Sequence, residues 1–175
     1  MRAISIRQPW AFAICYFGKR VENRDWDLRG GNIAQARRLV GSDILIHAAK
    51  GCTRDEWEDA CDFMKGFPHP HTGPKGETLK TIARGAIVAI AKLVAVTYTT
   101  EHEHRNTLNR IECDLCGHPI QEFRGGHSCD RPDPWAIPGT VGLILDNVRP
   151  IPVPIPFKGA LGFFEVPDGA PCGER

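Results

Sequence analysis

The chain lacks any long apolar run. No stretch of its 175 residues approaches the roughly eighteen consecutive apolar residues that a membrane-spanning helix requires. It also lacks a positively charged, apolar N-terminal leader, so the sequence predicts neither a membrane span nor a secretory signal, and we expect a cytoplasmic protein. No internal repeat is evident, and the length and the 42% hydrophobic content fit a single domain spanning residues 1–175.

Excess charge is also scarce. The 22 lysines and arginines almost balance the 21 aspartates and glutamates, which leaves a net charge of +1 and no strongly basic tail. Because sequence-indifferent binding to long duplexes depends on neutralising many phosphates, this kind of binding is disfavoured. The charge is unevenly spread, however, since residues 1–40 carry eight basic residues against three acids and residues 101–133 carry four against seven. We therefore expect any phosphate-binding surface in the N-terminal part.

Apolar and alternating segments predict five strands, and regularly spaced prolines predict one further extended segment along an edge. The strands are expected at residues 3–6, 43–48, 82–98, 141–148 and 163–166, and the proline segment at 150–156. Helices are expected from Pro9 to about Phe17 and behind a capping box that begins at Thr53. We interpret residues 30–42 as a polar excursion and residues 167–175 as a flexible tail.

The N-terminal segment concentrates recognition chemistry. Residues 5–26 hold two tryptophans, Trp10 and Trp26, among charged and amide side chains, a density more typical of a recognition surface than of a core. Arg7 and Gln8 occupy the predicted strand-to-helix turn, where exposed helix amides favour an anion such as a phosphate. Inward packing is the alternative for Trp10, whereas Trp26 stands between two aspartates and is expected to be exposed.

Four segments that bracket nearly the whole chain carry a family resemblance. They are the Ser5-Ile6-Arg7-Gln8-Pro9-Trp10-Ala11 opening, the K-x-x-E-x-R element at Lys19, Glu22 and Arg24, the strand at 44–48, and the closing segment at 156–164. In these motifs the chain resembles the ASCH family, the activating-signal-cointegrator homology domains of the PUA-like group. Phe17 stands where the family usually has a glycine, with Gly18 shifted by one, which we interpret as a local turn difference. The resemblance implies an α+β fold, a PUA-like small mixed β-barrel with flanking helices, and a cleft that handles nucleic acid or a modified nucleoside.

Indole faces and cations in this pattern fit single-stranded or flipped-out bases. The sequence contains no inserted helix or ribbon suited to reading the grooves of an intact duplex. Lys158 joins the candidates because the resemblance implies that its turn lies near the same cleft. The predicted partner is RNA, another single-stranded nucleic acid or a modified nucleotide, and the candidate contacts are Arg7, Gln8, Trp10, Lys19, Glu22, Arg24, Trp26, His47, Lys50 and Lys158.

Lys19 and Glu22 are also the catalytic candidates if the protein is an enzyme, a question that the sequence leaves open. A lysine can act as a base and a carboxylate can orient water, so the alternative function is a hydrolase acting on RNA or on a modified nucleoside, with His47 as a further acid/base candidate. One PUA-like amidohydrolase class has a threonine where Glu22 stands, and a carboxylate does not replace that hydroxyl in acyl transfer. The structural alternatives are a surface salt bridge between Glu22 and Arg24 and a barrel histidine with a backbone partner.

A cysteine and histidine cluster predicts a structural zinc. Residues 113–117 have the C-x-x-C-G form of a zinc knuckle, and a histidine and a further cysteine follow at a separation compatible with a small ribbon. The predicted ligands are Cys113, Cys116, His127 and Cys129, in a zinc-knuckle-like insertion that spans residues 101–134, with His118, His102 or His104 as alternatives to His127. Four protein ligands leave no open position for an activated water, so we expect a structural role.

The insertion has alternatives of its own. The simplest alternative is that its three cysteines are cytosolic thiols that bind no metal. A second alternative is that the insertion is a docking surface for a protein partner, although the sequence does not indicate which protein. Trp135, directly after the insertion, either stacks on a base or anchors the insertion by packing.

Overall fold

The computed structural model describes residues 1–65, 78–98, 135–137 and 139–167 of the chain. Within these residues the elements are β1 (Arg2–Ile6), α1 (Trp10–Tyr16), β2 (Val21–Arg24), α2 (Gly31–Leu39), β3 (Asp43–Ala48), α3 (Arg54–Met64), β4 (Ala86–Tyr98), β5 (Val141–Pro156) and β6 (Phe163–Glu165). The predicted α+β class is confirmed. The predicted zinc insertion, residues 101–134, lies outside the described residues, as does all of the predicted tail except Pro167.

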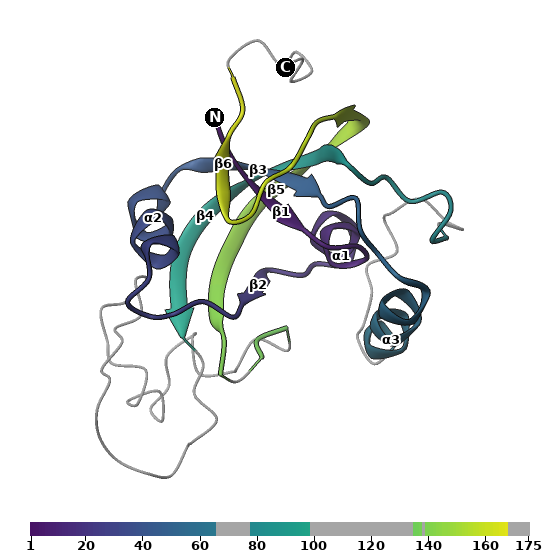
Figure 1. Cartoon of the computed structure of the whole chain (residues 1–175), viewed down its shortest axis with the longest axis horizontal. Coiled ribbons are helices and arrows are strands. Elements are labelled where there is room, and N and C mark those ends of the chain that lie inside the picture. The colour runs from purple at the N-terminus through teal and green to yellow at the C-terminus, as the bar shows by residue number, and fades with distance from the viewer. Residues whose placement is uncertain (66–77, 99–134, 138, 168–175) are drawn as a thin grey trace. The chain divides into compact units, whose positions relative to one another are not determined.

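The strands form one sheet in the order β2-β5-β4-β3-β1-β6 (Figure 1). Strand β1 pairs in parallel with β3 and antiparallel with β6, and β2 pairs antiparallel with the first residues of β5. A mixed sheet of this kind is compatible with the small barrel that the family resemblance implies. None of the helices in the described segments has the length and apolar character needed to cross a membrane.

The chain divides into two compact units, and both β4 and β5 contribute residues to each of them. Unit 1 comprises Met1–Lys19, Asp43–Ala91 and Asn147–Arg175, and unit 2 comprises Arg20–Ser42 and Lys92–Asp146. Strands β1, β3 and β6 and helices α1 and α3 therefore belong to unit 1, whereas β2 and α2 belong to unit 2.

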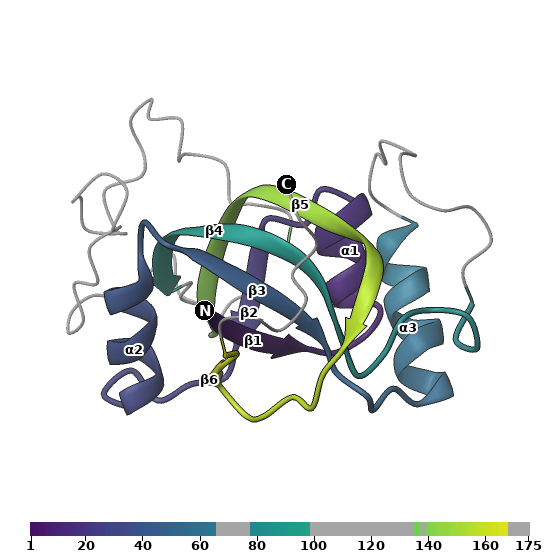
Figure 2. The ribbon, with the colours of Figure 1, turned by 90° about the horizontal axis from the view of Figure 1, so that it is seen from above.

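Unit 1 has its core around β1, which lies between β3 and β6 (Figure 2). Apolar side chains from β1, β3, β4 and β5 and from the residue after β6 meet there, and the cluster consists of Ala3, Leu45, Ile87, Ile155 and Val166. Burying a side chain of this kind stabilises a fold by about 1.5–3 kcal/mol for the larger ones. Helices α1 and α3 lie side by side in both views (Figures 1 and 2), and the rings of Trp10 and Phe63 meet edge to face at 5.8 Å between centroids.

Unit 2 holds β2 closely against β5. At Gly142 of β5 no side chain fits, because a Cβ atom there would lie 2.7 Å from Oγ1 of Thr97 and 3.0 Å from Cγ1 of Val21. After the C-terminal end of α2, the backbone N–H of Gly41 donates to the carbonyl of Leu93 at 2.7 Å, which connects this segment to β4. These contacts define the position of β2, the strand that carries Glu22 and Arg24.

Most predicted elements are found where the sequence placed them. The predicted strand at 43–48 is β3, the strand at 3–6 lies within β1, and the strand at 163–166 overlaps β6. Helix α3 begins at the predicted capping box, in which the Thr53 hydroxyl accepts the Glu56 N–H at 3.2 Å and the Glu56 carboxylate accepts the Thr53 N–H at 2.9 Å.

One predicted segment was wrong, and one predicted strand is shorter than expected. Residues 30–42 contain α2, and the prediction missed it because paired glycines and polar residues open the helix while only Ile33 and Ala36 are buried. The predicted strand at 82–98 begins only after Gly85, whose φ of 64° is left-handed and incompatible with a continuous strand.

The proline segment is a continuation of β5. Residues 150–156 are extended, as predicted, but they belong to the same strand as Val141 rather than to a separate segment. The four prolines are exposed, and β2 pairs only with the Val141–Ile144 part of β5. The prolines lie beyond the residues that pair with β2, so their missing N–H groups interrupt none of those bonds.

Candidate functional site

Four polar or charged side chains are buried in the part of the chain that the structure describes. Gln8, Lys19, Glu22 and His47 are exposed by only 3%, 3%, 7% and 2%. Burial of such groups costs free energy unless each finds compensating partners. All four residues are among the candidate contacts that the sequence motifs predicted.

Gln8 closes the turn between β1 and α1. Its Oε1 atom accepts the N–H of Phe12 at 3.0 Å, and its Nε2 atom donates to the carbonyl of Ala83 at 2.7 Å. The side chain therefore satisfies an amide in the first turn of α1 and ties that turn to the segment before β4. This amide was expected to attract an anion, but it is already bonded within the protein.

His47 uses both ring nitrogens inside unit 1. Its Nε2 atom lies 3.0 Å from the carbonyl of Phe157, which can only accept, so Nε2 carries the proton. Its Nδ1 atom therefore accepts from the Ser5 hydroxyl, also at 3.0 Å. Burial lowers the pKa of this imidazole, against an opposing effect of the hydrogen bond to Phe157. The geometry matches the alternative of a barrel histidine with a backbone partner better than it matches an acid/base residue.

The lowered pKa of His47 predicts a loss of stability in acid. Because the folded pKa lies below the ordinary 6.5, the unfolded chain takes up the proton first as the pH falls. The contribution of His47 is therefore complete above about pH 6.5 and declines below it, by at most about 1.4 kcal/mol per pH unit.

Urea unfolding of the wild type and of His47→Gln at several pH values checks this prediction. The variant keeps a donor for the Phe157 carbonyl but does not titrate, so its stability is expected to depend less on pH between 7.5 and 5.5 than that of the wild type. Equal pH dependence of the two proteins would show that His47 is not a source of acid sensitivity. Comparing the two proteins removes the contribution of the other histidines.

Trp10 and Lys19 form the first pair of a cation and an indole. The Lys19 ammonium lies 6.0 Å from the centroid of the half-buried Trp10 ring, at a distance typical of cation–π contacts. The Trp10 ring also meets the exposed ring of Phe63 on α3. An indole beside a cation offers a base a stacking face and offers its phosphate a positive charge. Because Trp10 is half-buried, its ring packs only partly inward, which was the structural alternative.

Arg24 and Trp26 form the second cation–indole pair, and the carboxylate of Glu22 forms an ion pair with Arg24. Glu22 and Arg24 are alternate residues of β2 and share a face of it. The Arg24 guanidinium lies 3.2 Å from Oε1 of Glu22 and 5.9 Å from the centroid of Trp26. The Glu22 and Arg24 side chains are only 9% and 20% exposed, so the ion pair is buried rather than a surface salt bridge. Trp26 is half-buried, whereas we expected it to be exposed.

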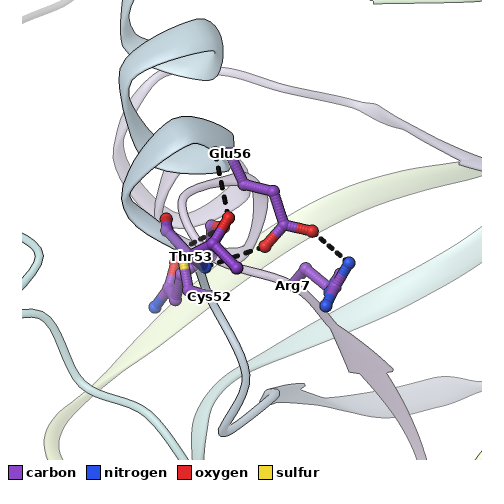
Figure 3. A network of polar contacts seen from close by, with 5 residues as sticks. Arg7, Cys52, Thr53 and Glu56 are labelled. Carbon is purple, nitrogen blue, oxygen red and sulfur yellow. Dashed lines mark hydrogen bonds and ion pairs between the residues drawn. The ribbon is translucent and has the colours of Figure 1, made fainter.

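The remaining cationic candidates are exposed. Arg7 pairs with Glu56 at the start of α3, where Figure 3 shows the two side chains pointing toward each other. The pKa of Glu56 is lowered, first by the Thr53 N–H and then by Arg7. Lys50 follows β3, and Lys158 precedes Gly159, whose backbone lies against His47. All of these residues belong to unit 1.

Trp135 is an anchor. Its side chain is only 5% exposed, and its carbonyl accepts the side-chain amide of Asn23 at 2.7 Å. Asn23 also accepts the N–H of Ile137 at 2.9 Å, so the segment after the insertion is bound to β2. Of the two predictions for Trp135, packing agrees with this burial better than base stacking.

The predicted zinc ligands Cys113, Cys116, His127 and Cys129 lie outside the described residues. Within residues 1–65, 78–98, 135–137 and 139–167 no histidines, cysteines and carboxylates gather in a group suited to a metal ion. Partial burial raises the pKa of the Cys15 thiol on α1 to about 12, which disfavours the thiolate that a nucleophile needs.

Sequence reasoning missed two residues of unit 1 that contact candidate residues. Phe63 of α3 was not among the candidates, but it is 47% exposed and contacts Trp10. Gly159 leaves room for His47, since a Cβ atom at this position would lie 2.6 Å from Nδ1 of His47 and 2.6 Å from Oγ of Ser5. The resemblance implied only that the turn at Lys158 lies near the cleft, and nothing in the sequence singled out Gly159.

Comparison with known proteins adds no family assignment. A scan against models of protein families finds no match, and a search of curated proteins finds none with significant similarity. The ASCH resemblance therefore rests on the motif residues alone.

Proposed function

We propose that the protein binds RNA, or another single-stranded or modified nucleotide, through an ASCH-type, PUA-like fold. The observation that carries this proposal is the pairing of a cation with an indole in each of the two units: Lys19 with Trp10, and Arg24 with Trp26. Exposed bases stack on aromatic faces and cations meet the backbone, which is the chemistry of single-stranded recognition.

Fluorescence titration tests the proposal. Short single-stranded RNA and DNA of the same sequence are added to the protein at low and at physiological salt, and tryptophan emission is followed. Saturable quenching by RNA, weakened in Trp26→Leu and in Lys19→Met, is the expected result, since each variant removes one half of a cation–indole pair. An exposed arginine on α2 gives the matched control, Arg38→Ala, which should bind like the wild type. Absence of quenching by either polymer would refute nucleic-acid binding.

A hydrolase that acts on RNA or a modified nucleoside is the second candidate, and one observation favours it. Lys19 and Glu22 are both nearly water-excluded, and a carboxylate and an amine in such surroundings are the groups that acid/base chemistry uses. Against it, one oxygen of Glu22 is engaged by Arg24. Incubating the titration samples and analysing them for cleavage products separates turnover from binding.

The structural zinc of the insertion remains a proposal. The ligands would be Cys113, Cys116, His127 and Cys129, whose types and spacing suit a closed tetrahedral site. Elemental analysis of the purified protein is expected to find about one zinc per chain, and Cys113→Ser together with Cys116→Ser should abolish it. The control is Cys61→Ser on α3, which should keep its metal. A metal-free wild type would leave the cysteines as plain thiols.

A further inference from the structure

Two hydrogen bonds, one from a side chain and one from the backbone, connect the chain segments that carry three cationic residues of unit 1. Residue 84 lies between two anchored neighbours: the carbonyl of Ala83 accepts from the Gln8 side chain, and the N–H of Gly85 donates to the carbonyl of Ala48, both at 2.7 Å. Gln8 follows Arg7 directly, and Ala48 is two residues before Lys50. The positions of Arg7, Lys50 and Arg84 are therefore linked through the fold rather than through flexible loops alone.

Side-chain proximities agree with this arrangement. A Cβ atom at Gly51 would lie 3.7 Å from the Arg7 guanidinium, and one at Gly85 would lie 3.9 Å from Cβ of Lys50. Arg84 and Arg7 also act together on the Cys52 thiol, where their charges lower the pKa while burial and Glu56 raise it more strongly. The charges of Arg7 and Arg84 therefore both reach Cys52, which lies in the segment between β3 and α3 that also carries Lys50.

The local charge balance is positive. Arg7 pairs with Glu56 (Figure 3), but neither Lys50 nor Arg84 makes an ion pair with any residue that the structure describes. Both side chains belong to exposed residues, as does Arg7. An exposed ion pair contributes little to stability, typically about 0–1 kcal/mol, so a stronger anion can replace Glu56 as the partner of Arg7.

We propose that Arg7, Lys50 and Arg84 form a phosphate-contact surface for the backbone of the nucleic-acid ligand, with Glu56 as the carboxylate that the phosphate displaces. The inference rests on the proposed function and adds Arg84, which no sequence motif singled out. Backbone phosphates are bound by arginine and lysine irrespective of base, so this surface would hold the strand while the indoles meet the bases. It would also account for binding without a strongly basic net charge.

Salt-dependent titration of variants tests the surface. Arg84→Ala is expected to weaken binding of short single-stranded RNA by a similar factor for every sequence and to reduce the slope of log affinity against log salt by about 0.7, the value for one lost contact to a single strand. Glu56→Gln is expected to strengthen binding, because glutamine preserves the capping box but no longer holds Arg7. Arg149→Ala, at another exposed arginine of unit 1 that pairs with Asp43, is the matched control and should leave the slope unchanged.

The outcomes distinguish this inference from the proposed function. If the wild type binds RNA but Arg84→Ala has the same affinity and the same salt slope, the surface is wrong while the function stands. Weaker binding of Glu56→Gln would contradict the displacement of Glu56. If the wild type binds no nucleic acid at all, both the function and the surface fail.

Discussion

Replacing Glu22 with glutamine is expected to lower the free energy of unfolding by about 3 kcal/mol while RNA binding remains measurable. The reason is the ion pair with Arg24, whose side chains are 9% and 20% exposed, so the variant leaves a nearly buried guanidinium without its countercharge. If the protein is instead a hydrolase that uses Glu22, product formation should fall by a factor of about 100 or more in the same variant. Urea unfolding, RNA titration and product analysis on one preparation measure all three effects.

A double-variant cycle provides the control for this prediction. Arg24→Met and the combination of Arg24→Met with Glu22→Gln are unfolded alongside the single variant, so that the coupling between the two side chains is isolated. We expect the combined variant to be more stable than the sum of the single effects predicts, by at least about 1 kcal/mol, because no charge is left unpaired. If the changes in the free energy of unfolding are additive, the interaction between Glu22 and Arg24 contributes nothing to stability.

Gly159→Ala is expected to have a comparable effect on unit 1. The added methyl group would overlap the His47 ring and lie 2.6 Å from the Ser5 hydroxyl oxygen, and His47 cannot move away without losing its bonds to Ser5 and Phe157. The loop must shift instead, which costs about 1–3 kcal/mol for an overpacked site and displaces the neighbouring Lys158. A fall in the melting temperature together with weaker RNA binding is the result that we expect.

The matched control is another glycine-to-alanine change. Gly31 opens α2, has no neighbour within 4 Å of an added Cβ atom and does not have a left-handed φ, so Gly31→Ala should be neutral or slightly stabilising. If Gly159→Ala is as stable as Gly31→Ala, the close approach of the loop to His47 does not constrain the fold.

Local patterns predicted the elements whose signals lie within a few residues. The apolar strand at 43–48 and the capping box at Thr53 are each determined by neighbouring side chains, and both were found as expected. Helix α2 was missed because only two of its side chains, Ile33 and Ala36, are buried, too few for a clear helical period.

The candidate residues were predicted by type but not by role. The polar motif residues Gln8 and His47 are buried as structural supports, and their partners Ala83 and Phe157 lie 75 and 110 residues away in the chain. The pairing of Arg7 with Glu56 spans 49 residues. No spacing rule specifies contacts between segments so distant, because they depend on how the strands pair.

Photo-crosslinking of the wild-type protein to a thiouridine-substituted single-stranded RNA, followed by peptide mass spectrometry, tests the central claim most directly. The account predicts adducts on the segments that hold Trp10 and Trp26, lost when an unmodified RNA competes. Adducts confined to other segments, such as α2, with measurable RNA binding, would contradict the assignment of the cation–indole pairs as the binding site.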